Sequence, residues 1–178
     1  MRVLIAGAAA LLATSGCMMG ARDLPQTASE ITGATAELRN ASGQTVGTAS
    51  AAPASGGLRI DLTATSLPAG VHAVHVHNVG SCTAPGFESA GPHWNPTGQQ
   101  HGTENPAGPH KGDLPNMTVA ADGRGSLSYT IPAAMLTGGM AAMLDADGAA
   151  VVVHAGGDDY RTDPSGNSGG RIACGVFR

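Results

Sequence analysis

The sequence has few aromatic residues, few charged residues and only three cysteines. Aromatic side chains make up 3% of the 178 residues, so the core must be built mainly from Val, Leu, Ile and Ala. Charged residues make up 12% and give a formal net charge of −4, which leaves no basic surface for nucleic acid and no polybasic patch for anionic lipid. The chain is too short to form two domains that each have a hydrophobic core of ordinary size. We therefore expect one domain and no nucleic-acid partner.

Long periodic segments are also scarce, because 27 glycines and 11 prolines divide the chain into short stretches. The stretch 58–64, LRIDLTA, alternates strictly between apolar and polar residues, which is typical of an antiparallel sheet with one solvated face. Further strand candidates are ATAELR, QTVGTAS, VHAVHVH, MTVAA, SLSYTI, AAVVVHA and RIACGVF. Two stretches, 80–115 and 156–170, have no regular period. The pattern predicts an all-β sandwich or barrel interrupted by two long functional loops.

The N-terminus has the features of an export signal. Arg2 precedes a short apolar run, VLIAGAAALLA, which is too short to cross a bilayer as a helix. The following LLATSGC resembles a bacterial lipobox, in which Cys17 would carry a lipid and become the new N-terminus, although the box prefers leucine at the position of Thr14. We expect residues 1–16 to be a signal peptide, 17–32 a flexible tether and 33–178 the folded domain. The protein would then be exported to the periplasm or cell envelope and lipid-anchored, with simple cleavage as the alternative.

The number of cysteines agrees with that division. Three cysteines in an exported protein leave one thiol to explain. If Cys17 is lipidated, Cys82 and Cys174 are free to pair in an oxidising compartment. The alternative is that Cys17 is removed or has no role.

Three of the seven histidines lie in the eight residues VHAVHVHN, 71–78. Residues two apart on a strand share a face, so His75 and His77 can offer two imidazoles to one ion, while His72 faces away and is expected to be structural. His154, at the end of AAVVVHA, could supply a third imidazole. A site rich in imidazole suits copper as well as zinc. The alternative is that these histidines are ordinary packed or surface residues.

The first long loop contains four further candidate ligands: His93, His101, His110 and Asp113. Three imidazoles and one carboxylate can close a tetrahedron around zinc with no position left for water, as in a structural site. Metal binding would also explain how a glycine-rich loop is ordered. The alternative is that the histidines are scattered in a solvated loop.

Five segments of the chain, in order, resemble the signature motifs of the copper-zinc superoxide dismutase family: GVHAVHVHNVGSC, AGPHWNP, HGTENPAGPHKGDLPN, VVVHAGGDDY and GNSGGRIACGVF. The resemblance extends from about residue 33 to the C-terminus. It implies an eight-stranded antiparallel Greek-key β-barrel or sandwich with two long functional loops. It also implies that the protein disproportionates superoxide to dioxygen and hydrogen peroxide, as antioxidant defence in the cell envelope.

The resemblance implies a role for each candidate residue. Copper would be held by His75, His77, His93 and His154, and zinc by His93, His101, His110 and Asp113, so that His93 bridges the metals and exchanges a proton during turnover. The second carboxylate, Asp158, would hydrogen-bond one ligand of each metal. Arg171 would attract the anionic substrate, and a Cys82–Cys174 disulfide would tie the first loop to the last strand.

The sequence leaves several alternatives open. Only four residues separate His77 from Cys82, a compact connection that could alter a dimer surface, so both a homodimer and a monomer are possible. The second loop contains Arg161 but no lysine, whereas many family members place lysines there to steer superoxide. Rival functions are a copper-chaperone docking module and a lipoprotein that stores zinc or copper. The complete ligand set favours the enzyme.

Overall fold

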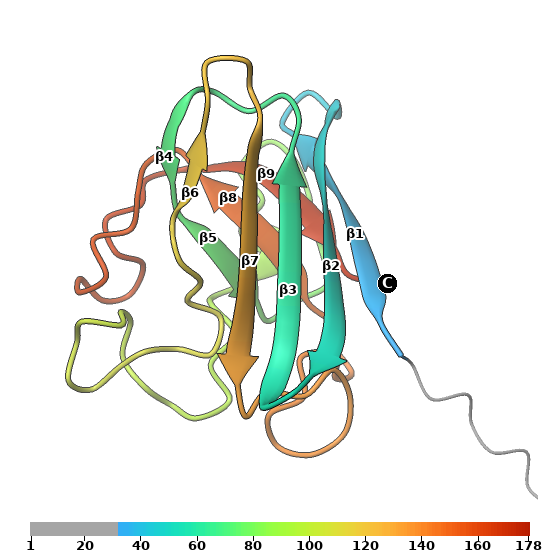
Figure 1. The fold of residues 1–178 in the computed structure, drawn as a ribbon, viewed down its shortest axis with the longest axis vertical. Coiled ribbons are helices and arrows are strands. Elements are labelled where there is room, and N and C mark those ends of the chain that lie inside the picture. The colour runs from blue at the N-terminus through green and yellow to red at the C-terminus, as the bar shows by residue number, and fades with distance from the viewer. Residues whose placement is uncertain (1–31) are drawn as a thin grey trace, which may run out of the picture.

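The structure is a computed structural model that describes residues 32–178. Within these residues the chain forms nine strands, one short 3-10 helix and no α-helix (Figure 1). Their bounds are β1 (Ala34–Asn40), β2 (Thr45–Ala54), β3 (Gly57–Ala64), β4 (Gly70–His72), β5 (Val74–His77), η1 (Glu88–Ala90), β6 (Met117–Val119), β7 (Gly125–Pro132), β8 (Ala150–His154) and β9 (Arg171–Val176). The expected signal peptide, most of the tether and Cys17 lie outside the described residues.

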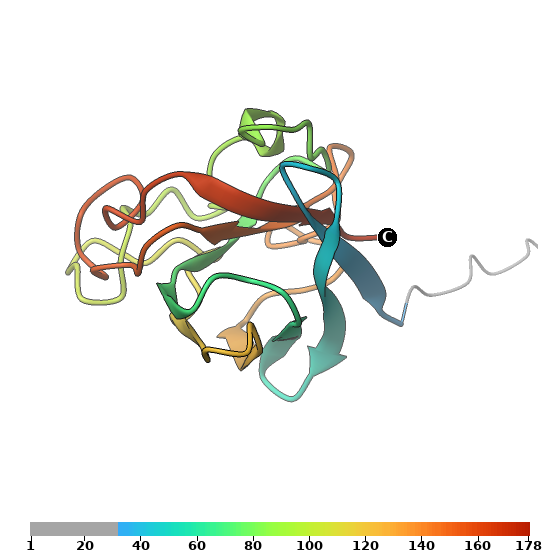
Figure 2. The ribbon, with the colours of Figure 1, turned by 90° about the horizontal axis from the view of Figure 1, so that it is seen from above.

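The strands form one antiparallel sheet in the order β4-β6-β7-β3-β2-β1-β9-β8-β5. Its two end strands, β4 and β5, are consecutive in the chain, so the sheet curls into a nearly closed barrel around a common interior (Figure 2). The all-β antiparallel architecture with two long loops is confirmed. No helix among the described residues is long and apolar enough to cross a membrane.

The strand count differs from the expected eight because the stretch VHAVHVH is divided at Ala73. Before this residue β4 pairs with β6, and after it β5 pairs with β8. The backbone of Ala73 instead bonds to the second loop and to β8: its N–H donates to the carbonyl of Gly156, and its own carbonyl accepts from the N–H of His154. One expected strand therefore serves both edges of the sheet.

The core follows from the alternation of the strands. The apolar side chains of LRIDLTA in β3 are all buried, and the polar ones between them are exposed or half-buried. By contrast, every residue of β5 and β8 is buried. In β8 alternate residues pack into the barrel core, while Ala150 and Val152 pack outward against Phe87 and Cys174. The segment around Phe87 thus covers the outer face of β8.

The two long loops leave the barrel on the same side and contact each other (Figures 1 and 2). The first connects β5 to β6 and contains η1, and the second connects β8 to β9. The N–H of Glu104 in the first loop donates to the carbonyl of Tyr160 in the second at 2.9 Å. A third irregular stretch, 133–149, joins β7 to β8 and was not predicted as a loop.

Candidate metal centre

The first long loop reaches the site by running along the edge of β5 that has no neighbouring strand. The N–H of Trp94 donates to the carbonyl of Val76 at 2.8 Å, and the N–H of Leu114 donates to the carbonyl of Val74 at 3.3 Å. A side chain at Gly112 would collide with the carbonyl of Val76, so only glycine permits this approach. This arrangement places His93 opposite His77 and Asp113 opposite His75.

The structure brings the four predicted copper ligands together. One donor atom from each of His75, His77, His93 and His154 lies within 4.8 Å of the others, and all four residues are buried. These four residues form the copper group. The ring centroids of His75 and His93 are 4.0 Å apart, and those of His75 and His154 are 4.8 Å apart.

In three of these histidines one ring nitrogen is hydrogen-bonded and the other is not. His75 Nε2 lies 2.7 Å from Asp158 Oδ2, His77 Nδ1 lies 2.8 Å from the carbonyl oxygen of Gly91, and His154 Nδ1 lies 3.1 Å from that of Gly169. These acceptors place the N–H on the bonded nitrogen and a lone pair on the opposite one. The opposite nitrogens, His75 Nδ1, His77 Nε2 and His154 Nε2, are buried and have no hydrogen-bond partner within residues 32–178.

Unpaired buried polar atoms are costly and therefore rare, so three of them in one group call for an absent partner. A metal ion satisfies three converging lone pairs at once, and the opposite hydrogen bonds orient the rings for it. Burial lowers the pKa of His75 to about 3, that of His77 to about 2 and that of His154 to about 4. All three are therefore neutral near pH 7 and able to bind an ion.

The predicted zinc ligands also lie together, around the carboxylate of Asp113. Its Oδ1 lies 2.9 Å from His93 Nδ1, 3.1 Å from His101 Nδ1 and 3.2 Å from His110 Nδ1. Its Oδ2 accepts the backbone N–H groups of Gly102 and His110 at 2.9 and 3.0 Å. Three imidazole nitrogens and a fixed carboxylate oxygen fit a tetrahedral zinc ion.

By mutual donor distance, the second group of four consists of His75, His93, His101 and Asp113, with His75 in place of His110. His110 nevertheless belongs to the same cluster, since its Nδ1 lies 3.4 Å from His93 Nδ1. His75 and His93 are members of both groups, and of these two His93 also lines the cleft.

Without a metal, a proton on His101 can balance the negative charge of Asp113 in the second group. Burial alone would raise the pKa of Asp113, but the contact with His101 and the hydrogen bonds from His110 and His93 hold it far below the usual range. Burial would lower the pKa of His101, but the contact with Asp113 and the hydrogen bond to Asp158 outweigh it and raise the pKa to about 9. The position therefore favours a positive charge. A bound metal ion would take the place of the proton on His101.

Asp158 connects the two groups. Its Oδ2 accepts from His75, and its Oδ1 lies 3.0 Å from His101 Nε2. The side chain of Asn116 holds its backbone in both directions: Nδ2 donates to the Asp158 carbonyl at 2.9 Å and Oδ1 accepts the Asp158 N–H at 2.8 Å. A Cβ at Gly166, which has φ +64°, would collide with the Asp158 carboxylate.

Sequence reasoning did not single out Asn116 and Gly166. Asn116 is the last residue of the segment HGTENPAGPHKGDLPN, and Gly166 lies among the glycines of the second loop. Neither residue type by itself indicates a contact with a distant aspartate. Asn116 and Asp158 are 42 residues apart in the sequence. His72 lies outside both groups, as the strand alternation predicted, and its ring nitrogens contact the carbonyl oxygens of His154 and Pro68.

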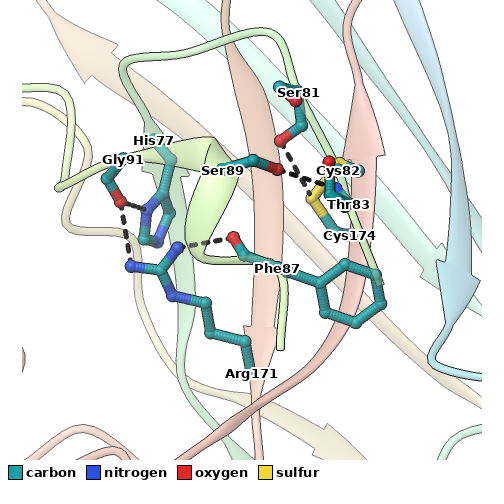
Figure 3. The surroundings of a disulfide bond; sticks show 9 residues. All are labelled: His77, Ser81, Cys82, Thr83, Phe87, Ser89, Gly91, Arg171 and Cys174. Atoms are coloured by element: carbon teal, nitrogen blue, oxygen red, sulfur yellow. Dashed lines mark hydrogen bonds between the residues drawn. A yellow bond between two sulfur atoms is a disulfide. The ribbon is translucent and has the colours of Figure 1, made fainter. Parts of the chain in front are cut away.

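Arg171 lines the cleft that leads to the copper group. The cleft has a volume of about 700 Å³, and its lining includes His77, His93 and His154. The guanidinium donates from one terminal nitrogen to the carbonyl of Phe87 at 2.7 Å and from the other to that of Gly91 at 2.9 Å (Figure 3). Because the Gly91 carbonyl also accepts from His77, one peptide group orients both residues.

The Cys82–Cys174 disulfide is present, which confirms that pairing. It joins the segment that carries Phe87 and Gly91 to β9, the strand that begins with Arg171 (Figure 3). Within the segment, the N–H of Thr83 donates to Ser89 Oγ at 2.7 Å. The disulfide therefore fixes the carbonyl groups that hold the Arg171 side chain.

The pKa shifts of the buried histidines and aspartates predict how the stability of the metal-free protein depends on pH. The copper-group histidines bind protons in the unfolded chain below their ordinary pKa of 6.5 but not in the folded one, so stability falls as the pH drops below about 6.5. The lowered pKa values of Asp113 and Asp158 extend this loss below pH 3.8. His101 acts oppositely: its contribution is complete below 6.5 and is lost as the pH rises towards 9. Urea denaturation of the metal-free protein should give the highest midpoint near pH 6.5 and a steeper acid side, and a midpoint that does not change between about pH 7 and pH 4.5 would contradict this.

Comparison with known proteins agrees with this geometry. Residues 43–177 match the family model described as copper/zinc superoxide dismutase. The chain is 42% identical over 147 residues to "Superoxide dismutase [Cu-Zn] 2" of Aquifex aeolicus, which covers 80% of this chain and 85% of that one. Among solved structures, a SOD-like protein from Bacillus subtilis is 43% identical with a TM-score of 0.76, covering 80% of this chain and 96% of its own. The Cu/Zn superoxide dismutase from Brucella abortus is 31% identical with a TM-score of 0.64, covering 82% and 99%. With histidine and aspartate groups that could bind copper and zinc, the chain belongs to the copper/zinc superoxide dismutase family.

Proposed function

We propose that this protein disproportionates superoxide to dioxygen and hydrogen peroxide. Copper would be held by His75, His77, His93 and His154, and zinc by His93, His101, His110 and Asp113. The observation that carries the proposal is the set of three buried, unpartnered ring nitrogens that meet His93 beside a cleft lined by Arg171. When bound, copper supplies one-electron chemistry, which zinc lacks.

The protein must supply protons, because two superoxide anions consume two protons to give one dioxygen and one hydrogen peroxide. His93 is suited to this role because it belongs to both donor groups and also lines the cleft. Its Nδ1 faces Asp113 Oδ1 at 2.9 Å, so Nε2 is the atom that can hold and release a proton on the cleft side. Asp158 keeps His75, a member of both groups, and His101, a member of the second, in orientation.

Arg171 attracts and orients the anion. Two of its N–H groups are used by the Phe87 and Gly91 carbonyls, which leaves the guanidinium further N–H donors for a ligand in the cleft. A fixed cation in a cleft raises the local concentration of a small anion.

We expect Arg171→Ala to retain both metals and to slow turnover at low ionic strength by about ten- to a hundredfold. The rate should also lose most of its dependence on salt, because the screened charge is gone. Elemental analysis and turnover at increasing salt measure both effects. Arg171→Lys is the matched control: it keeps a charge but not the planar guanidinium that reaches two carbonyl groups. Loss of copper from Arg171→Ala would assign Arg171 a structural role instead.

The test of the function is superoxide disproportionation by the protein loaded with copper and zinc. The result expected is rapid turnover with both metals at one per chain and a visible copper absorption band. A docking module or a storage protein would bind metals without turnover. Loaded protein that fails to accelerate disproportionation would overturn the proposal.

We also propose that the protein acts in antioxidant defence in the cell envelope, after removal of residues 1–16 and lipidation of Cys17. The apolar run followed by LLATSGC supports this location. Residues 17–32 would then link the anchor to the folded domain. Cys17→Ser should move the protein from the membrane pellet to the soluble fraction. Equal distribution of the variant and the unmodified sequence would argue against the anchor.

A further inference from the structure

A second cavity reaches the predicted zinc ligands separately from the cleft beside Arg171. It has a volume of about 360 Å³ and is lined by the first long loop and by the last residues of β7. Asp113 lines this second cavity and not the cleft, His110 lines both, and His93 lines the cleft and not the second cavity. The predicted zinc ligands can therefore be approached from two directions.

The two directions differ in what a zinc ion would have to pass. Towards the cleft it would pass His93 and the other histidines of the copper group. The second cavity is lined by none of these four described residues, and its ligands are His110 and Asp113, which are 8% and 5% exposed. His101, which lines neither opening, is 0% exposed. The second cavity therefore connects the zinc ligands to solvent without disturbing the copper group.

Lys111 holds the loop wall of the second cavity against the strand wall. Its Nζ donates to the carbonyl of Pro132, the last residue of β7, at 2.7 Å. Lys111 directly follows His110, so this hydrogen bond attaches the loop to the barrel beside a predicted zinc ligand. On the other side of Lys111 the backbone is already fixed, since the N–H of Gly112 donates to the carbonyl of Trp94 at 2.8 Å. Loss of the Lys111 contact should therefore loosen the His110 side of the loop more than the Asp113 side.

We propose that zinc enters and leaves the protein through the second cavity, and that the contact of Lys111 with Pro132 limits the rate. The inference rests on the proposed placement of zinc at His93, His101, His110 and Asp113, and does not depend on superoxide turnover. A hydrogen bond from an ammonium group is stronger than one between neutral groups, so breaking it adds to the barrier for opening. Copper would keep its four imidazoles during opening, because His110 does not belong to the copper group.

The experiment measures zinc exchange in protein loaded with copper and zinc. Isotopically enriched zinc is added in excess, and elemental mass spectrometry of the desalted protein follows the exchanged zinc and the copper content in the same sample. Lys111→Met removes the charged donor but keeps an unbranched side chain. This variant should exchange zinc about three- to thirtyfold faster than the unmodified protein and retain its copper.

Two control variants separate the hydrogen bond from the loss of a charge. Lys111→Arg can still donate to the Pro132 carbonyl and should exchange zinc at nearly the unmodified rate. Arg124→Met makes the same change in net charge as Lys111→Met, but in the exposed turn before β7 and outside the second cavity. Its zinc exchange should also be unchanged.

Two bulky substitutions distinguish the second cavity from the cleft as the route. Thr97→Phe places a ring in the second cavity, and Ser165→Phe places one in the cleft. Zinc exchange should be slowed by Thr97→Phe and not by Ser165→Phe. Melting temperatures establish that each variant is folded. Because Thr97→Phe and Lys111→Met are expected to change the rate in opposite directions, a general loss of stability cannot account for both.

The expected result is faster zinc exchange in Lys111→Met and slower exchange in Thr97→Phe, with constant copper content in both. Unmodified exchange in Lys111→Met, loss of copper together with zinc, equal acceleration in Arg124→Met, or slowing by Ser165→Phe in place of Thr97→Phe would overturn the inference. If the variants behave as expected in a protein without superoxide turnover, the function is wrong and the zinc route stands. If the unmodified protein turns over superoxide but Lys111→Met exchanges zinc at the unmodified rate, the zinc route is wrong and the function stands.

Discussion

Replacing His77 by alanine is expected to lower superoxide turnover by more than about a hundredfold. The substitution removes Nε2, one of the three buried nitrogens of the copper group that have no hydrogen-bond partner, and opens the group to solvent. It also removes the ring that shares the Gly91 carbonyl with Arg171. The copper content should fall, while the zinc content should stay near one per chain, because His77 does not belong to the second donor group.

Turnover, elemental analysis and the visible spectrum of His77→Ala and His75→Ala measure these effects together. The two variants differ in a useful way, since His75 also contacts Asp158 and through it His101. His75→Ala should therefore weaken zinc retention as well, whereas His77→Ala should not. Equal turnover in both variants and in the unmodified protein would reject the enzymatic function.

Removing the Cys82–Cys174 disulfide is expected to lower the free energy of unfolding by about 2–5 kcal/mol. The bridge joins residues 92 positions apart, and a crosslink over so long a segment restricts the unfolded chain strongly. It also lies against the buried contact of Phe87 with β8. Urea denaturation with and without a reductant measures the change, with the Cys82→Ser, Cys174→Ser double variant as the control that reductant should not affect further. An unchanged midpoint after reduction would contradict the prediction.

The disulfide should affect turnover even while the protein is folded. The bridged segment carries the Phe87 and Gly91 carbonyls that hold Arg171, so loosening it lets the guanidinium leave the cleft (Figure 3). We expect reduced, folded protein to lose salt-dependent turnover while its zinc content is unchanged. Full activity in reduced protein would mean that β9 alone positions Arg171.

Much of the candidate site was predictable because its information is local. The alternation of VHAVHVH places His75 and His77 on one face of a strand, and the structure has them in one donor group. The loop histidines and Asp113 could be identified because few residue types bind zinc and all four occur within 21 residues of glycine-rich chain. The all-β fold followed from short alternating stretches such as LRIDLTA, whose periodicity is a property of the strand itself.

The sequence by itself determined which residues could bind metals and that they would lie on strands and loops of an antiparallel β-sandwich or barrel. Only the tertiary structure decided that one expected strand divides at Ala73, since this depends on backbone bonds to Gly156 and His154. It also decided which nitrogen of each ring is free, because the acceptors, Asp158 and the Gly91 and Gly169 carbonyls, come from other segments of the chain. Local periodicity is set by the geometry of a single strand, whereas hydrogen-bond partners depend on how distant segments pack.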